Sequence, residues 1–205
     1  MTGFDIECTA CPRLADFLAD IRQQYPDYHG LPVAPFGDEH PDVLIVGLAP
    51  GMHGANATGR PFTGDYAGVL LYETLHKTGF SNQSVSDHVD DGLELINCRI
   101  TNAVKCLPPQ NKPTGAEINQ CNAFLKVELE SLESKRLLIA LGSIAHNAIL
   151  KALGLKLSAY KFGHAAEHEL PGDFTLIDSY HCSRYNTQTK RLTAEMFEQV
   201  FERAR

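Results

Sequence analysis

The chain alternates strand-like and helix-like segments, and this alternation limits its fold more than any other feature. Continuous apolar runs predict four strands, within residues 42–49, 93–104, 136–142 and 174–181. Apolar residues at helical spacing predict five helices, at residues 12–25, 66–79, 114–132, 143–153 and 193–203. Strands and helices in turn indicate a mostly parallel sheet with helices on both of its faces.

Composition is that of an ordinary globular protein, and one domain spanning residues 1–205 is the expected organisation. Of the 205 residues, 43% are hydrophobic and 21% are charged. No apolar run approaches the roughly 20 residues that span a bilayer. The opening segment, "MTGFDIECTACPRL", lacks the basic and then apolar order of a signal peptide. We therefore expect a cytoplasmic protein, and we take it to be a monomer.

Three long polar loops follow the first, second and fourth strands. They read "GLAPGMHGANATGRPFTGD" (47–65), "NAVKCLPPQNKPT" (102–114) and "HCSRYNTQTKRLT" (181–193). A structural crossover needs only a few residues, so loops of this length and composition indicate a binding or catalytic site. Carboxyl ends of parallel strands share one edge of the sheet, so the loops are expected to converge on one cleft. The third strand enters its helix through a short "GS" and is expected to contribute little.

The distribution of charge matters more than the formal net charge of −7, which by itself argues against a nucleic-acid partner. Residues 99–112 and 181–192 carry lysines and arginines and no acidic residue, whereas acidic residues crowd into residues 87–94. If the two basic stretches share a face, they form a phosphate-binding surface on a negatively charged chain. The alternative is ordinary solvated charge.

The cysteines indicate a metal centre. Cys8 and Cys11 form C-x2-C, and Cys106 and Cys121 form C-x14-C. Because no export signal is present, disulfides are disfavoured and metal binding gains weight. Four thiolates can hold zinc or an iron–sulfur cluster. A zinc ribbon would have a second C-x2-C, which is missing, so the cluster is favoured; four unrelated buried thiols are the remaining alternative.

Together these segments resemble the uracil-DNA glycosylase superfamily, in particular its iron–sulfur family 5 (type b) members. The three loop segments, extended to "ITNAVKCLPPQNKPT" and "SYHCSRYNTQTKRLT" for the second and third, are similar to that family's three motifs in order. The N-terminal C-x2-C followed by "PRL" also fits, and the likeness runs from residue 8 to about residue 197. The resemblance implies a three-layer αβα sandwich around a four-stranded parallel sheet, which agrees with the alternation of elements.

The resemblance also implies an activity and a cofactor. The activity is excision of uracil, with hypoxanthine or xanthine as further substrates, from double-stranded DNA, which initiates base excision repair. The product is an abasic site without a strand break, because no lysine is evident as a Schiff-base nucleophile. The cofactor is a structural 4Fe-4S cluster on the four paired cysteines: Cys8, Cys11, Cys106 and Cys121. The alternatives are a DNA-binding protein of this fold without catalysis, or a thiol- or zinc-dependent enzyme that uses Cys182 with His181.

Excising a base requires a platform for the flipped base, donors that face its growing negative charge and a positioned water. Phe62, among glycines outside the sheet, is the candidate platform, with a core role as the alternative. His181 is the candidate electrophile, since either protonation state donates toward a carbonyl oxygen. Asn102 stands where family 4 enzymes carry the asparagine that reads uracil, and its amide suits that role or a strand-end cap.

The group that positions the water is less clearly indicated. Asp65 resembles the family 5 candidate for holding water, although a carboxylate there also suits the start of the helix at residue 66. Asn111 is a second candidate for the water or for substrate contact. Leu48 stands where other branches of the superfamily place Asp or Glu. Three further residues are expected to contact the substrate or shape the pocket: Gly51, His53 and Asn56.

The loop after His181 is basic and interleaved with aromatic residues. The superfamily uses this loop to enter the minor groove and support extrusion of the base, and its cations are expected to contact phosphates. The candidate DNA-binding residues are Arg184, Tyr185, Asn186, Lys190 and Arg191. Cys182 stands where the family usually has proline, and loss of the fixed φ angle loosens the loop, so a slower or differently specific enzyme is expected.

Overall fold

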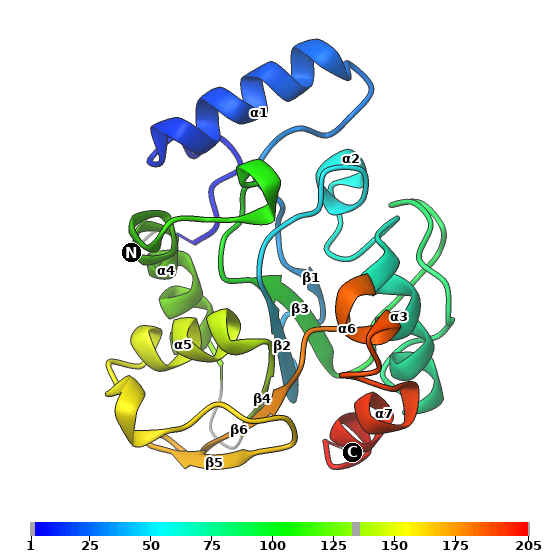
Figure 1. The fold of residues 1–205 in the computed structure, drawn as a ribbon, viewed down its shortest axis with the longest axis vertical. Coiled ribbons are helices and arrows are strands. Elements are labelled where there is room, and N and C mark those ends of the chain that lie inside the picture. The colour runs from blue at the N-terminus through cyan, green and yellow to red at the C-terminus, as the bar shows by residue number, and fades with distance from the viewer. Residues whose placement is uncertain (1–2, 133–135, 205) are drawn as a thin grey trace.

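A central sheet of six strands organises the computed structural model, which describes residues 3–132 and 136–204 (Figure 1). The strands lie in the order β1-β3-β2-β4-β6-β5. Their bounds are β1 (Phe36–Gly37), β2 (Val43–Gly47), β3 (Cys98–Asn102), β4 (Arg136–Leu141), β5 (Glu167–Leu170) and β6 (Phe174–Ser179). The expected single domain spans residues 1–205. Of these, residues 1–2, 133–135 and 205 lie outside the described part of the chain.

The four predicted strands are present and mutually parallel, but the sheet is wider than predicted. Neighbours in the series β3-β2-β4-β6 pair in parallel, as the alternation of elements requires. β1 and β5 add an antiparallel strand at each edge. The prediction of four strands missed both, because β1 has only two residues and β5, "EHEL", has no continuous apolar run. The edge strands leave the predicted architecture unchanged.

Helices cover both faces of the sheet and form the outer layers of the sandwich. α4 and α5 pack together on one face, and α3 and α7 pack together on the other (Figure 1). The bounds are α1 (Pro12–Gln24), α2 (Ala55–Thr58), α3 (Tyr66–Lys77), α4 (Gly115–Glu130), α5 (Ser143–Ala152), α6 (Arg184–Gln188) and α7 (Ala194–Glu202), with short 3-10 turns η1 (Pro109–Asn111) and η2 (Leu157–Ala159). The predicted capping box of Thr114 and Glu117 is present at the start of α4.

Alternating side chains of β2 enter two separate cores. Val43 and Ile45 pack in the core beneath α3 and α7, whereas Leu44 and Val46 pack in the core beneath α4 and α5. Every residue of β2 is buried. Burial on both faces explains why this strand is a continuous apolar run rather than an alternating pattern.

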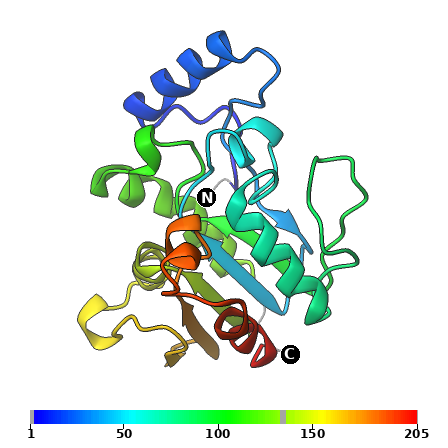
Figure 2. The same ribbon diagram turned by 45° about the vertical axis from the view of Figure 1, so that its right-hand side comes forward.

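α1 lies beyond the sheet at the end where the site loops emerge (Figure 1). Its buried residues, Leu14, Leu18 and Ile21, pack in a third cluster with residues of the second loop. The segment between α3 and β3 stands away from the body in Figure 2 and contains the acidic residues 87–94. Within residues 3–132 and 136–204, no helix has both the length and the apolar character needed to cross a membrane.

Candidate active site

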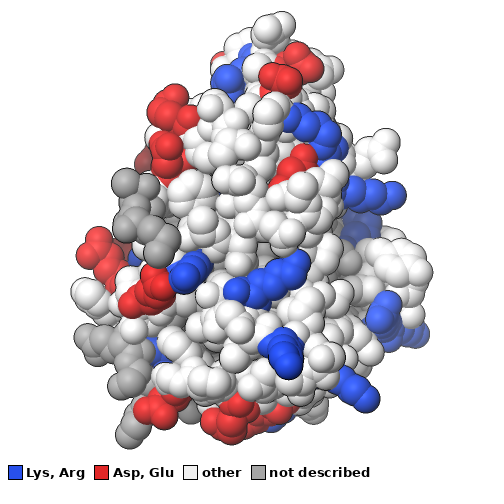
Figure 3. Space-filling view, turned by 90° about the vertical axis from the view of Figure 1, so that its left-hand side faces the viewer, with Lys and Arg blue, Asp and Glu red and all other residues white. Residues whose placement is uncertain are grey.

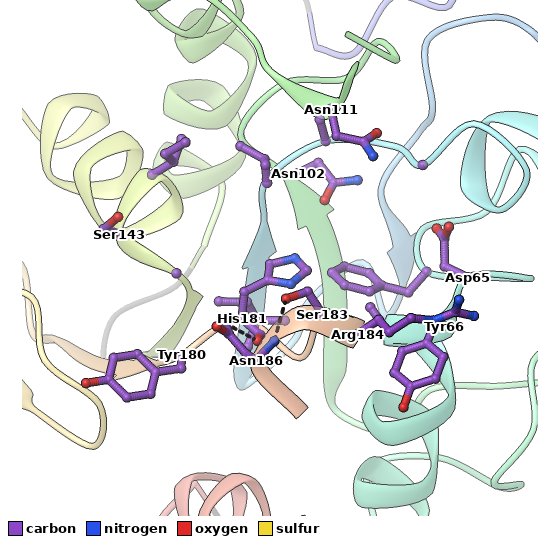
Figure 4. A pocket seen from close by; sticks show the side chains of 18 of the residues that line it. Asp65, Tyr66, Asn102, Asn111, Ser143, Tyr180, His181, Ser183, Arg184 and Asn186 are labelled. Atoms are coloured by element: carbon purple, nitrogen blue, oxygen red, sulfur yellow. Dashed lines mark hydrogen bonds between the residues drawn. The ribbon is translucent and has the colours of Figure 1, made fainter. Parts of the chain in front are cut away.

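The three predicted loops meet in one cavity of about 530 Å³ at the carboxyl edge of the parallel strands. In Figure 4, Asp65, Tyr66 and Arg184 lie on one side of this cavity, Ser143 and Tyr180 on the other, and His181 and Asn102 between them. Of the predicted site residues, the cavity is lined by Gly51, Phe62, Asp65, Asn102, Asn111, His181, Arg184, Asn186 and Arg191.

The cavity has a further wall that the sequence analysis did not anticipate. Residues 141–144, at the junction of β4 and α5, line it, so the expectation that this junction contributes little is wrong. The carboxyl-edge rule applied to all four strands would have found it. Phe162 and Tyr180 also line the cavity. Phe162 lies in an irregular segment between η2 and β5, where no sequence pattern identified it.

Phe62 forms the floor of the cavity in a strained conformation. Its φ angle is 58°, in the left-handed region, and the residue is 6% exposed. The ring stacks on His181, with centroids 6.0 Å apart and an interplanar angle of 28°. A non-glycine residue held in this region points to a local requirement that outweighs the backbone cost.

Gly47 makes room for both Phe62 and Asn102. It ends β2 and pairs in register with Asn102 at the end of β3. A Cβ atom on Gly47 would lie 2.4 Å from Oδ1 of Asn102 and 2.7 Å from Cζ of Phe62. Asn102 is buried, and its Oδ1 has no hydrogen-bond partner among the described residues. The amide oxygen is therefore available for a donor on a ligand.

His181 is a neutral imidazole whose Nδ1 is buried, although the residue as a whole is partly exposed. Its Nδ1 finds no hydrogen-bond partner in the described structure, and burial lowers the pKa of the ring from 6.5 to about 4. The backbone carbonyl of His181 accepts a hydrogen bond of 2.8 Å from Nδ2 of Asn186, which fixes the turn after β6. At neutral pH the ring therefore carries one N–H donor and no charge.

Asp65 is turned away from the helix that it was expected to cap. It occupies the N-cap position of α3 but makes no side-chain capping bond there. Its Oδ2 accepts a hydrogen bond of 3.2 Å from the backbone N of Ala55, at the start of α2. Burial raises the pKa of this carboxyl, while the bonds from Ala55 and Gly51 lower it.

Two glycines give Asp65 its space. A Cβ atom would lie 2.3 Å from Oδ1 of Asp65 if placed on Gly51, and 2.0 Å from its Cγ if placed on Gly54. On the second loop, Asn111 ends η1 with a φ angle of 56° and is exposed. Asp65 and Asn111, the two candidates for positioning water, thus both line the same cavity.

His53 and Asn56 lie outside the lining of the cavity. The exposed His53 packs edge-on against Tyr25 and Tyr28, and its Nδ1 is 2.9 Å from the Tyr28 hydroxyl. Asn56 is fully buried, and its Nδ2 donates a 3.4 Å hydrogen bond to the Met52 carbonyl. Their contacts hold the first loop together, so a direct contact with substrate stays a prediction.

The third loop contains a short helix and two arginines held on tyrosines. Ser183 caps α6 by accepting a hydrogen bond from the backbone N of Asn186. The guanidinium of Arg184 lies 4.8 Å from the ring centroid of Tyr66, and that of Arg191 lies 4.4 Å from Tyr180. Of the other predicted contacts, Tyr185 is 70% exposed and Lys190 has a φ angle of 56°.

The expected phosphate surface needs one correction. Lys105, one of the cations of residues 99–112, is buried and forms an ion pair with Glu128 and a hydrogen bond with Thr101. It is therefore unavailable to a phosphate. On the face seen in Figure 3, Lys and Arg side chains lie across the centre and toward the right-hand edge, and acidic side chains lie mainly at the left, top and bottom.

The four paired cysteines line one small pocket of about 80 Å³. The backbone N of Lys105 donates a 3.2 Å hydrogen bond to Sγ of Cys121. Among the described residues, no three of these sulfurs lie within 4.8 Å of one another. Tetrahedral zinc, with Zn–S distances of about 2.3 Å, requires sulfurs roughly 3.8 Å apart. No trio of these sulfurs in the described part of the chain has the spacing of a tetrahedral zinc site.

Cys182 is unsuited to nucleophilic chemistry. It is fully buried and does not line the cavity. Burial raises the pKa of its thiol to about 12, so the thiolate is not formed near neutral pH. The alternative of a thiol-dependent enzyme that pairs Cys182 with His181 loses its nucleophile.

Comparison with known proteins places the chain in a family. Residues 34–205 match the family model described as the uracil DNA glycosylase superfamily. The chain belongs to the uracil-DNA glycosylase superfamily. Membership assigns it to the DNA N-glycosylases, which are hydrolases. The resemblance stated from the motifs is confirmed.

Curated relatives match over nearly the whole chain. The Type-5 uracil-DNA glycosylase of Thermus thermophilus is 45% identical over 203 residues, covering 97% of this glycosylase and 92% of the relative. The Type-5 uracil-DNA glycosylase of Pyrobaculum aerophilum is 40% identical over 203 residues, covering 97% of this chain and 88% of the relative. A Type-4 uracil-DNA glycosylase of Pyrobaculum aerophilum is 38% identical over 113 residues, covering 55% of this chain and 50% of the relative. The similarity to the type-5 relatives therefore extends over more of the chain than the similarity to the type-4 relative.

Proposed function

We propose that this glycosylase excises uracil from double-stranded DNA by hydrolysing the N-glycosidic bond, and so initiates base excision repair. The observation that carries the proposal is the meeting of an aromatic ring, an unpartnered buried amide and a neutral imidazole in one cavity: Phe62, Asn102 and His181. The relatives named type-5 uracil-DNA glycosylases support the same activity.

The cavity suits a nucleotide that has left the base stack. The ring of Phe62 offers a face for a flat base, and the unpartnered Oδ1 of Asn102 accepts from an imide N–H such as N3–H of uracil. Rotating the nucleotide out of the duplex costs a few kcal/mol, which contacts of this kind offset. Hypoxanthine and xanthine present a comparable N–H beside a carbonyl, so we include them as substrates.

His181 stabilises the departing base. As the glycosidic bond breaks, positive charge grows on the sugar and negative charge on the base oxygens. The neutral imidazole donates its one hydrogen bond to such an oxygen without the cost of burying a second charge. Water is held by Asp65 and Asn111, which line the same cavity, and Asp65 as a carboxylate also stabilises the positive charge on the sugar.

The product is an abasic site with an intact strand. None of the described residues that line the cavity is a lysine, so a Schiff base with the sugar has no evident nucleophile there. Arg184 and Arg191 line the cavity, and in this proposal they bind phosphates of the strand that carries the extruded nucleotide.

We propose that Cys8, Cys11, Cys106 and Cys121 hold a 4Fe-4S cluster. When bound, the cluster acts as a structural cross-link, and the reaction itself involves no electron transfer. The meeting of the four cysteines in one pocket and the N–H donor to Cys121 support this assignment. Free thiols and a cluster of this kind are typical of the cytoplasm, where we place the protein.

Incubation of the cluster-containing protein with defined oligonucleotides tests the proposal. Duplexes that carry one uracil, hypoxanthine or xanthine, and the single-stranded uracil oligonucleotide, are incubated and then treated with alkali to cut abasic sites. We expect cleavage at uracil in the duplex, and a loss of about 100- to 1,000-fold in rate for His181→Ala, because a donor to the developing anion is removed. The matched control is His164→Gln, a histidine that does not line the cavity.

Two outcomes would contradict the proposal. Absence of cleavage above the His181→Ala level would remove the enzymatic function, and tight binding of the duplex without cleavage would favour the catalytically inactive alternative. That alternative depends on Leu48, which lines the cavity where other branches of the superfamily place an acid. Cleavage before alkali treatment would contradict the monofunctional mechanism.

A further inference from the structure

A second group of metal-ligating side chains lies behind the wall of the cavity. His146 on α5, His168 on β5 and Asp178 on β6 bring one ligand atom each to within 4.8 Å of one another. α5, β5 and β6 lie together toward the β5 edge of the sheet, away from α1 (Figure 1). His146 and Asp178 are buried, and the side chain of His168 is 15% exposed.

The carboxylate of Asp178 lies close to both imidazoles. Oδ1 of Asp178 lies 2.7 Å from Nδ1 of His146, and Oδ2 lies 3.4 Å from Nε2 of His168. The rings of the two histidines have centroids 5.6 Å apart and are inclined at 67°. Each carboxylate oxygen thus faces a different imidazole, and the fully buried carboxylate has no solvent contact.

Neighbouring backbone groups orient these ligands from outside. Nε2 of His146 donates a 3.1 Å hydrogen bond to the Tyr160 carbonyl, which leaves Nδ1 as its inward atom. The backbone N of Gly163 donates a 3.3 Å hydrogen bond to Oδ2 of Asp178. Histidines that bind metals usually donate their other ring N–H to a carbonyl or carboxylate in this way.

One atom of the group lacks a partner. Nε2 of His168 is buried and makes no hydrogen bond with the described residues. A buried polar nitrogen without a partner costs roughly 1–3 kcal/mol, so such atoms call for a bound ion or water. The unpartnered atom is the one that faces the carboxylate of Asp178.

We propose that His146, His168 and Asp178 bind a divalent transition metal ion of the zinc class. Two imidazole nitrogens and one carboxylate oxygen are a donor set that zinc prefers, at about 2.0–2.2 Å from each atom. The ion lies between the three ligand atoms and displaces the proton between His146 and Asp178, because metal ligands must be unprotonated. A water molecule supplies the fourth position, as is common where protein ligands number three.

The ion would brace the unanticipated wall of the active-site cavity. Phe162, which lines the cavity, packs edge-on against His146 with ring centroids 5.7 Å apart. Tyr160 and Gly163, on either side of Phe162, are bonded to the two buried ligands. Metal binding therefore ties α5, β5 and β6 to the segment that carries Phe162, a structural role separate from the cysteines.

Metal analysis of the cluster-containing protein tests this site. Wild type, His168→Gln and the control His164→Gln are prepared with matched iron content, so that the cysteines are equally occupied. They are then incubated with zinc and passed through a desalting column. We expect about one additional zinc per chain in wild type and in His164→Gln, and none in His168→Gln. Zinc should raise the melting temperature of wild type and of His164→Gln, but not that of His168→Gln.

The identity of the ligands is read independently on wild type, should His168→Gln fail to fold. X-ray absorption at the zinc edge should give nitrogen and oxygen ligands at about 2.0–2.1 Å with imidazole scattering. Zinc–sulfur distances of about 2.3 Å would place the ion on cysteines and overturn the proposal. Equal zinc content in wild type and His168→Gln, or no zinc in either, would overturn it as well, leaving a water or a direct hydrogen bond as the partner of His168.

Discussion

His181 depends on burial for the property that makes it useful. A histidine in water is partly charged near pH 6.5, whereas burial lowers the pKa of this ring to about 4. Among the described residues the ring stacks on Phe62 and Nδ1 has no hydrogen-bond partner, so neither of these contacts stabilises a positive charge. The sequence identified His181 from its place after a strand, but its charge state follows from packing that no local pattern specifies.

The lowered pKa makes stability depend on pH in a defined direction. Between pH 6.5 and about 4 the unfolded chain protonates this residue and the folded protein does not, so the free energy of unfolding falls as pH falls through that window. Lowering the pH from 7.5 to 5 should therefore reduce the free energy of unfolding, measured with urea, more in wild type than in His181→Asn. The expected difference between the two reductions is about 2 kcal/mol. Equal reductions in the two proteins would show that the ring is not held neutral.

The ends of two strands, rather than any one side chain, set the geometry of the base site. Gly47 ends β2 opposite Asn102 at the end of β3, and its missing Cβ leaves the space that Phe62 and Asn102 fill. In Gly47→Ala both side chains must move, and a displacement of about 1 Å can cost about 100-fold in rate. We expect kcat/KM for uracil release to fall by about that factor.

Gly115→Ala is the matched control for Gly47→Ala. Gly115 begins α4, and an added Cβ there meets no atom within 4 Å. Alanine also favours a helix over glycine by up to about 1 kcal/mol, so stability should be kept or raised. If Gly47→Ala retained wild-type kcat/KM, or if Gly115→Ala lost it equally, the proposed packing at the strand ends would be wrong.

Long elements were predictable from the sequence and short ones were not. The parallel strands and the helices α1, α3, α4, α5 and α7 have the predicted order, because each buries enough apolar surface to impose its own period on the sequence. β1 and β5 exist through pairing with β3 and β6 at the sheet edges, which is tertiary information. Two short helices, at residues 55–58 and 184–188, lie inside segments that the sequence predicts only as polar loops.

Asp65 shows why part of the site escaped local rules. An acidic residue before a helix is ordinarily a cap, and the sequence allowed either that role or a role with water. The structure removes the side chain from α3 and directs it toward α2, into space left by Gly51 and Gly54. The folded first loop, with its glycines, thus excludes a capping bond to α3, and the role of Asp65 with water stays a prediction.

The paired cysteines join segments that are distant along the whole chain. Cys8 and Cys11 precede α1, Cys106 lies in the second loop and Cys121 lies in α4, yet all line one pocket. A cluster there links the N-terminal segment to the second loop and α4. The sequence predicted which cysteines meet, because their spacing matches that of the family that the chain resembles.

Cys106→Ser tests this link, with Cys98→Ala as the control. Cys98 is a fully buried cysteine of β3 that does not line the pocket, so its loss affects packing alone. We expect Cys106→Ser to lose bound iron and visible absorbance. We also expect its free energy of unfolding to fall by about 2 kcal/mol, which for a chain of this length lowers Tm by about 4–8 °C. Cys98→Ala should keep its iron. Full iron content in Cys106→Ser would exclude Cys106 as a ligand.

The two arginine–tyrosine pairs beside the cavity have a consequence for how a chain of net charge −7 meets a polyanion. Each guanidinium is already held over a ring, so little side-chain freedom is lost when it neutralises a phosphate. Every neutralised phosphate releases condensed counterions and adds about 0.9 to the slope of log affinity against log salt. These two positions alone give a slope of roughly −1.8, so ionic strength governs how long the protein stays on DNA between encounters with a damaged base.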